Sequence, residues 1–148
     1  MLDTLMKFGA YRVDYFEKPR IWNPNAFGFY IRAEVEDGSP YNRESKHQLY
    51  EGLDLIQNKL GMGNLVGIYL DVNCLRNLSR PAYQQMKKDM ADGLFSRILI
   101  LEEAAIFGCP GTEQDLLDLA NHIGSIHVWV WDGNSIRPKI VEPVLVEA

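Results

Sequence analysis

The sequence is poor in residues that usually mark a redox, metal or nucleophilic site. It has only two cysteines, Cys74 and Cys109, which form no CxxC pair. This excludes a disulfide-rich scaffold, and because neither thiol has a neighbouring histidine, we interpret both as inert. The three histidines, His47, His122 and His127, share no metal-ligand spacing. We therefore interpret them as structural residues and expect no histidine or cysteine metal site.

Long apolar runs and an excess of basic charge are also missing. No run approaches the roughly 20 residues that span a bilayer. The opening MLDTLMKFGAYR lacks the basic end, apolar segment and cleavage site of a signal peptide. We therefore expect a cytoplasmic protein without a membrane partner. With 15 Lys and Arg against 20 Asp and Glu, the formal net charge is −5. This charge excludes a protein whose whole surface embraces DNA, although a local basic face remains open.

A glycine-rich phosphate-binding motif is the third absence. The segment GMGN at 61–64 precedes an apolar run instead of following one, which is the wrong context for a dinucleotide or P-loop site. Otherwise the composition, 47% hydrophobic and 24% charged, is that of a soluble globular protein. A chain of 148 residues is long enough for one domain with a substantial core.

What the sequence does contain is an alternation of strand and helix patterns around the segment 67–101. Two short apolar runs there flank a helix that is predicted to begin at Pro81 and to stop near Gly93. Two strands joined by such a helix predict a right-handed parallel crossover. The same patterns predict strands at 27–35, 65–72 and 126–131, a helix from Ser45 to Gly61 and another from Thr112 to Gly124. Ser45 and Gln48 have the spacing of a capping box.

The order βαβαβαβ predicts a single α/β domain. We expect a three-layer α/β/α sandwich with a mostly parallel sheet of about four core strands, formed by residues 27–131. Residues 1–26 are predicted to be an N-terminal extension that packs on this domain and holds one short strand. Residues 132–148 are predicted to be a turn followed by an extended tail. Pro138 and Pro143 in that tail allow only an edge strand or an irregular segment.

Polar residues follow the predicted strands, and ligands of open parallel sheets bind beyond the carboxyl ends of the strands. Arg32 and Arg80 are candidate phosphate-binding residues, because a planar guanidinium donates paired hydrogen bonds to phosphate oxygens. Ordinary ion pairs are the simpler alternative. Glu34, Asp71 and Glu102 offer the hard oxygen ligands that Mg²⁺ prefers. Helix capping and solubility are the simpler explanation of these acids.

Four segments in order resemble the catalytic domain of serine recombinases, the resolvase and invertase family. They are FYIRAEVED, ESKHQLYEGLDLIQNKLG, VGIYLDV and SRPAYQQMKKDMADGLFSRILIL. The residues at matching places are Tyr30, Arg32, Ser45, Gln48, Tyr69, Asp71, Arg80, Pro81 and Gly93. The resemblance covers about residues 27–131. It implies a resolvase-like α/β fold and carries over only Arg32 and Arg80 as phosphate contacts.

The same comparison implies a degenerate active site. The nucleophilic serine would fall two residues after Arg32, where this chain has Glu34. A carboxylate cannot form the phosphoserine link and would repel the scissile phosphate. The arginine-bearing segment expected within residues 102–111 is EEAAIFGCPG, so most of the charge that would stabilise the transition state is missing. We also expect the family's long dimer helix and helix-turn-helix domain to be absent.

These observations favour a catalytically inactive resolvase-like domain that needs no cofactor. We expect it to act as a binding or oligomerisation module, with a protein partner or its own copies, in DNA recombination or mobile-element biology.

Two alternatives stay open. One is a Mg²⁺-dependent enzyme of nucleic-acid phosphoryl transfer that uses Glu34, Asp71 and Glu102, a layout that resembles topoisomerase-primase domains. The other is weak nonspecific DNA binding, for which the cations would be Arg32, Arg80, Lys87 and Lys88. A solvated helix face explains the two lysines more simply.

Overall fold

The computed structural model describes residues 11–16, 25–33, 43–72, 80–107 and 110–143. These residues form one mixed six-stranded sheet with the order β1-β3-β2-β4-β5-β6. The strands are β1 (Tyr11–Tyr15), β2 (Phe27–Ala33), β3 (Leu65–Val72), β4 (Arg97–Ile100), β5 (Ile126–Trp131) and β6 (Ile136–Val141). Strand β2 pairs in parallel with β3 and β4, and β4 pairs in parallel with β5. The edge strands β1 and β6 are antiparallel to β3 and β5.

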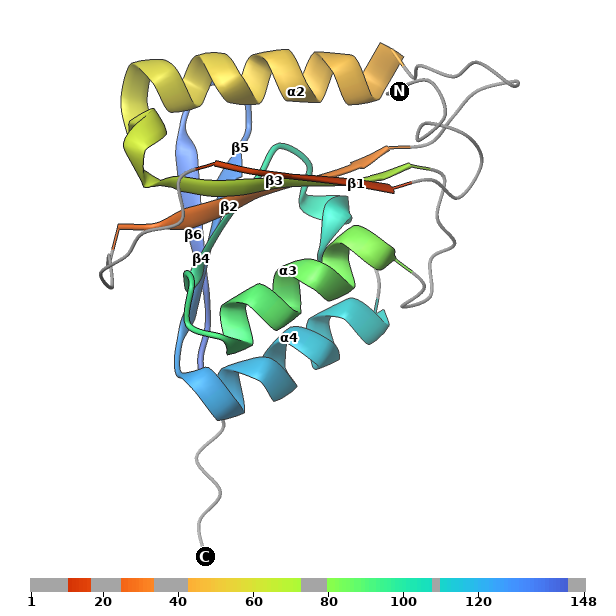
Figure 1. Ribbon diagram of the computed structural model, residues 1–148, viewed down its shortest axis with the longest axis vertical. Helices are drawn as coiled ribbons and strands as arrows, with labels where there is room; N and C mark the ends of the chain where they lie inside the picture. The colour runs from red at the N-terminus through yellow and green to blue at the C-terminus, as the bar shows by residue number, and fades with distance from the viewer. Residues whose placement is uncertain (1–10, 17–24, 34–42, 73–79, 108–109, 144–148) are drawn as a thin grey trace, which may run out of the picture.

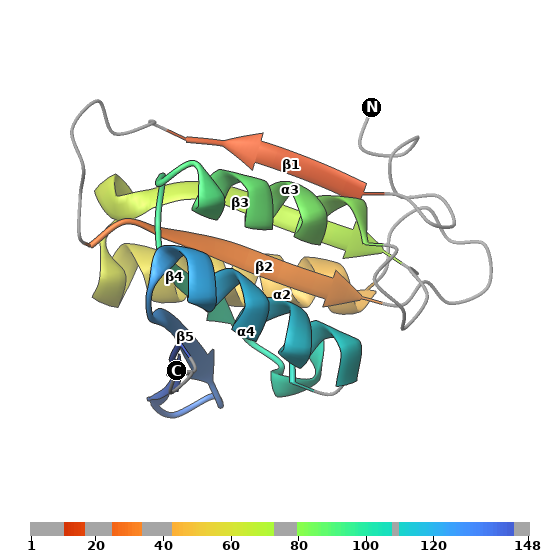
Figure 2. The same ribbon diagram turned by 90° about the horizontal axis from the view of Figure 1, so that it is seen from below.

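Helices lie on both faces of the sheet. Helix α2 (Arg43–Leu55) covers one face, and α3 (Pro81–Ala91) and α4 (Pro110–Ile123) cover the other (Figures 1 and 2). Helix α2 continues into a single π-helical turn, η1 (Ile56–Leu60). The prediction of an α/β fold is therefore confirmed. The sheet differs from the prediction in having six strands and in being mixed, because both edge strands run antiparallel to their neighbours.

Two hydrophobic cores fill the spaces between the sheet and the helices. Successive residues of a strand point to opposite faces, so Tyr30 packs towards α3 and α4 whereas Phe29 and Ile31 pack towards α2. All three side chains are fully buried. A central strand that is covered on both sides is apolar almost throughout, which explains why β2 lacks the alternation of polar and apolar residues that marks a half-exposed strand.

Several element boundaries agree with the predicted ones. The strands predicted at 65–72 and 126–131 are β3 and β5 with those bounds. Gly93 and Gly124 follow α3 and α4 with φ angles of 85° and 98°. Glycine adopts this left-handed conformation at little cost, so it ends helices where other residues would continue them.

Two predicted helix starts are wrong. Helix α2 begins at Arg43, so Ser45 lies within it, and the Gln48 amide donates instead to the main-chain oxygen of Arg32 at 3.3 Å. Helix α4 begins at Pro110, so Thr112 lies in its first turn and is not its N-cap. Pro110 fits this position because a first-turn residue needs no N–H donor.

The two ends of the described chain extend the sheet at opposite edges. The short strand predicted within residues 1–26 is β1, which aligns Val13 with Tyr69 of β3. Of the two alternatives predicted for the C-terminal segment, an edge strand or an irregular tail, residues 136–141 form an edge strand, β6, which places Pro138 opposite Trp129. Proline is tolerated there because an edge strand has one side without a ladder partner. None of the helices in the described ranges is long and apolar enough to cross a membrane.

Close packing of α2 on β2 depends on Gly52. A Cβ atom at this position would lie 2.1 Å from Cζ of Phe29, whose ring is fully buried. We expect Gly52→Ala to lower the free energy of unfolding by about 1–3 kcal/mol, because the ring has no space to move into. Helix propensity alone predicts a gain of up to about 1 kcal/mol. Urea denaturation followed by circular dichroism measures the difference.

The matched control is Gly63→Ala, because an added Cβ there meets no atom within 4 Å. Its expected effect is within about 0.5 kcal/mol. A Gly52→Ala protein at least as stable as the wild type would contradict the packing argument.

Candidate functional site

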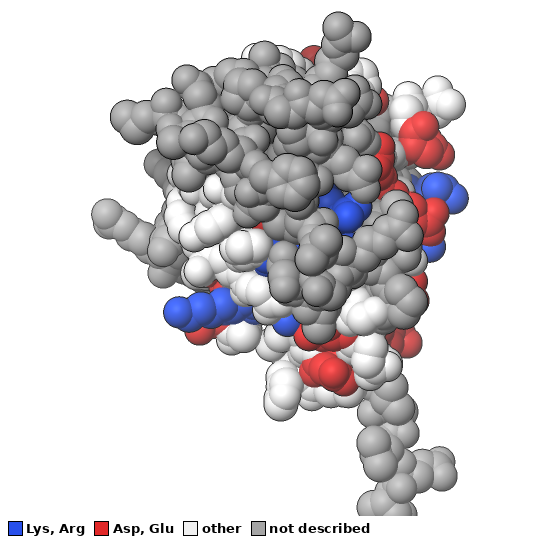
Figure 3. Space-filling view, turned by 90° about the vertical axis from the view of Figure 1, so that its right-hand side faces the viewer, with Lys and Arg blue, Asp and Glu red and all other residues white. Residues whose placement is uncertain are grey.

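The candidate site lies where β2 and β3 end. The parallel register places Arg32 beside Asp71, so the two side chains leave the sheet on the same face. This is the face that α3 covers, because two main-chain N–H groups of α3 donate hydrogen bonds to Asp71. Figure 3 looks onto this end of the molecule, where Lys and Arg atoms are visible near the middle and Asp and Glu atoms lie mainly towards one side.

The Asp71 carboxylate is fully buried, and three groups of the described residues donate hydrogen bonds to it. The donors are the Tyr30 hydroxyl at 2.8 Å and the main-chain N–H groups of Ala82 at 2.9 Å and Tyr83 at 3.0 Å. The two N–H groups belong to the first turn of α3, where they have no partner within the helix. Asp71 therefore caps α3 from a neighbouring strand, and its negative charge favours the positive end of the helix dipole.

Arg80 precedes α3 and is equally inaccessible. Its side chain is 0% exposed, and its Nη1 donates to the main-chain oxygen of Ala105 at 2.6 Å. Ala105 belongs to a single helical turn (Glu103–Ala105) that follows β4. Arg80 thus ties the start of α3 to the helical turn that follows β4. The Arg80 side chain is therefore not accessible to a phosphate from solvent, whereas Arg32 is partly exposed.

Burial dominates the protonation chemistry of this cluster. It raises the pKa of the Asp71 carboxyl, while the hydrogen bonds from Ala82, Tyr30 and Tyr83 and the charge of Arg80 act in the opposite direction. Burial, together with the charge of Asp71, also raises the pKa of the Tyr30 hydroxyl well above its usual range. Tyr30 is therefore a stable hydrogen-bond donor and not a source of protons at physiological pH.

Of the three carboxylates predicted to hold Mg²⁺, Asp71 and Glu102 belong to the described residues. Glu34, the degenerate nucleophile position, lies outside the described residues, as do Cys74 and Cys109. Glu102 is exposed at the end of β4. Within the described part of the chain, no three His, Cys, Asp or Glu side chains gather closely enough to hold a metal ion. The magnesium site stays a prediction that depends on Glu34.

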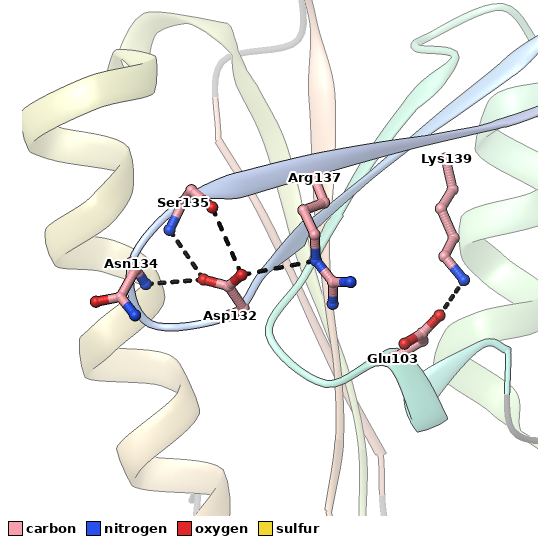
Figure 4. A network of polar contacts seen from close by, with 6 residues as sticks. All are labelled: Glu103, Asp132, Asn134, Ser135, Arg137 and Lys139. Carbon is pink, nitrogen blue, oxygen red and sulfur yellow. Dashed lines mark hydrogen bonds and ion pairs between the residues drawn. The ribbon is translucent and has the colours of Figure 1, made fainter.

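The acid beside Glu102 serves a structural contact. Glu103 forms an ion pair with Lys139 of β6, and this pairing lowers the pKa of the Glu103 carboxyl. Nearby, Asp132 accepts hydrogen bonds from the main-chain N–H groups of Asn134 and Ser135, both at 2.9 Å, which lower its pKa. Figure 4 shows both contacts: the Glu103–Lys139 ion pair joins β6 to the turn after β4, whereas the Asp132 hydrogen bonds lie within the turn of the β5–β6 hairpin.

Of the two lysines considered for DNA binding, only Lys88 is exposed. Lys87 forms an ion pair with Asp115 of α4, and its ammonium lies 5.3 Å from the centre of the Tyr83 ring. Its side chain is only 18% exposed. Lys87 therefore joins α3 to α4 and does not belong to an open, solvated face. The difference arises because α4 packs against the side of α3 that carries Lys87.

A second buried carboxylate, Asp89, has no counterpart in the predictions from sequence. It accepts hydrogen bonds from the hydroxyls of Tyr15 and Tyr69, both at 2.7 Å, and from Gln85 at 2.9 Å. Burial and the Asp89 carboxylate raise the pKa of Tyr15 to about 12. The cluster ties β1 to α3. The sequence signal that could have identified Asp89 is its place between Met86 and Met90 on the apolar face of α3.

Comparisons with known proteins add no family to this description. No family model, no curated protein and no solved structure matches the chain. The resemblance to serine recombinases therefore rests on the quoted segments alone, and the chemistry of the site has to be argued from the residues of this chain.

Asp71→Asn is expected to destabilise the protein by about 2–4 kcal/mol. The substitution removes the charge that faces Arg80 and replaces one acceptor oxygen with a donor, so a buried N–H or hydroxyl loses its partner. Chemical denaturation measures the loss. The control Asp118→Asn removes a charge from an exposed residue of α4 and should change stability by less than about 0.5 kcal/mol. Equal effects of the two substitutions would contradict a capping role for Asp71.

Titration calorimetry with Mg²⁺ tests the metal alternative. We expect no binding heat at millimolar Mg²⁺, because both Asp71 oxygens already accept hydrogen bonds from protein groups. Glu102→Gln is the informative variant, since Glu102 is exposed and its substitution leaves the core intact. Heat in the wild type that disappears in Glu102→Gln would contradict this expectation and favour the phosphoryl-transfer enzyme.

Proposed function

We propose that this chain is a resolvase/invertase-like domain that does not catalyse DNA strand exchange and acts as a binding or oligomerisation module in DNA recombination or mobile-element biology. The observation that carries the proposal is the closed polar cluster at the carboxyl ends of the strands. Asp71 and Arg80 are fully buried and bind protein groups. Their role is to join β3, α3 and the turn that follows β4.

The finer fold assignment, a three-layer α/β/α sandwich of the resolvase type, belongs to the same proposal. The parallel pairing of β2 with β3 and β4, and the helices on both faces of the sheet, support it. Residues 27–131 hold the elements that the resemblance covers. Strands β1 and β6 add one edge each to this unit.

The loss of catalysis follows from what strand exchange requires. The reaction needs a hydroxyl nucleophile and guanidinium groups that reach the oxygens of the reacting phosphate. This chain has Glu34 at the nucleophile position and EEAAIFGCPG in the arginine-bearing segment. Of the two arginines that carry over, Arg80 is 0% exposed and donates to the Ala105 carbonyl.

The edges of the sheet support the oligomerisation part of the proposal. Among the described strands, β1 and β6 each have one neighbour, so each offers a second edge to another strand. Tyr11 on β1 and Ile140 on β6 are 47% and 52% exposed. Large exposed side chains on an open edge suit contact with a second copy or another protein, and the net charge of −5 disfavours a DNA-binding surface.

Sedimentation velocity over a range of concentrations tests the module. We expect a mass that exceeds 16.9 kDa and rises with concentration. Tyr11→Lys and Ile140→Lys form a matched pair, one exposed position on each edge, and the substitution at the contacting edge should restore the monomer. Incubation with supercoiled plasmid tests the loss of catalysis and should give neither cleavage nor a covalent adduct with DNA.

A strict monomer that retains no partner in affinity pull-downs would contradict the module. DNA cleavage, or an adduct that survives denaturing electrophoresis, would contradict the loss of catalysis.

A further inference from the structure

A small pocket lies on the α2 side of the sheet, away from the Asp71 cluster. Its volume is about 190 Å³, and its lining residues are Glu51, Asp54, Leu55, Asn58, Lys59 and Trp131. They come from α2, from η1 and from the last residue of β5. Trp131 reaches this face because the side chains of β5 alternate, which directs Trp129 and Trp131 towards the core under α2.

The indole of Trp131 is held in a fixed orientation and already faces a cation. Its Nε1–H donates to Oε1 of Glu51 at 3.1 Å, and the other Glu51 oxygen lies 3.1 Å from Nε2 of His47. The ammonium of Lys59 lies 5.1 Å from the centre of the Trp131 ring, within the range of cation–π attraction. The pocket therefore combines an aromatic face with carboxylates at its rim.

The π-helical turn η1 shapes the other wall. The N–H of Gly61 donates to the carbonyl of Ile56, five residues earlier, at 2.6 Å. Such turns are rare and are found frequently at functional sites. This one carries Asn58 and Lys59 to the pocket, where the Asn58 amide donates to Asp54 at 3.0 Å and fixes the second carboxylate.

We propose that this pocket binds an arginine side chain presented by a partner protein. The inference rests on the proposed binding function and names the chemistry of the partner. A volume of about 190 Å³ lies below the range of roughly 300–1,000 Å³ for small-molecule sites, so a single side chain fits it better than a metabolite. Two carboxylates and a net charge of −5 attract basic segments and repel phosphates.

Lys59 occupies the position of the incoming cation. Its side chain is exposed and belongs to a flexible residue type, so it can leave the ring when a guanidinium arrives. A guanidinium stacks flat on an indole and still donates hydrogen bonds in its plane to carboxylates, which an ammonium does less well. Asp54 and Glu51 are the acceptors within the pocket. The wild-type protein thus binds arginine in competition with its own lysine.

The experiment follows the Trp131 indole N–H in nuclear magnetic resonance spectra during titration with N-acetyl-arginine amide. Trp131→Phe assigns the resonance. We expect a shift that saturates, and no saturating shift with N-acetyl-citrulline amide, which has the same shape without the charge. Glu51→Gln combined with Asp54→Asn should weaken binding about three- to fivefold. A Gln side chain at position 51 keeps an oxygen that can accept the hydrogen bond from the Trp131 indole N–H.

Lys59→Ala provides the sharpest test, because competition predicts binding at least about twofold tighter. Weaker binding in this variant would overturn the proposal, as would equal shifts with arginine and citrulline or a shift that never saturates. The matched control is Glu113→Gln with Asp118→Asn on α4, which removes the same charge from exposed positions on the opposite face and should leave the affinity unchanged.

The two proposals fail separately. Self-association without arginine binding would contradict only the proposal that the pocket binds arginine. Arginine binding together with a covalent DNA adduct would support the pocket proposal and contradict the proposal of an inactive recombinase-like domain.

Discussion

The buried carboxylate of Asp71 is the interaction on which the arrangement of the strand ends depends. It accepts hydrogen bonds from the Tyr30 hydroxyl of β2 and from two N–H groups of α3. Because Asp71 itself belongs to β3, these bonds join three elements at one point. Arg80 extends the connection to the turn after β4 through the Ala105 carbonyl. A buried charge is costly unless hydrogen bonds and an opposite charge compensate it. The elements around Asp71 are therefore held in the arrangement that supplies those partners.

This arrangement changes the meaning of the polar residues found in the sequence. Strand-end acids and arginines suggest chemistry because active sites of parallel sheets lie there. Buried charge networks that hold a fold together use the same residue types. Exposure and partners distinguish the two roles. Asp71 and Arg80 are inaccessible and bind protein groups, and the acid Glu103 is paired with Lys139.

The two faces of the sheet differ in what they offer to other molecules. On the α3 and α4 face, the carboxylates of Asp71 and Asp89 are enclosed by tyrosines and helix donors. On the α2 face, the carboxylate of Glu51 is partly exposed beside the Trp131 ring. A charge that is already compensated inside the protein stabilises the fold, whereas a partly exposed carboxylate next to an aromatic face can still gain from a ligand.

The sequence by itself determined the elements whose signals are local. Strands 65–72 and 126–131 follow from continuous or alternating apolar runs, and the helix ends at Gly93 and Gly124 follow from a backbone conformation that favours glycine. The sequence also predicted that Arg32 and Asp71 lie together at the carboxyl ends of neighbouring parallel strands, where ligands of open sheets bind. Only the tertiary structure decided that Arg80 is buried, that Asp71 caps α3 and that Trp131 meets Glu51. Tyr30 and Asp71 are 41 residues apart, and Glu51 and Trp131 are 80 apart. No local pattern encodes such a pairing, because it depends on which strands become neighbours and which helix covers each face.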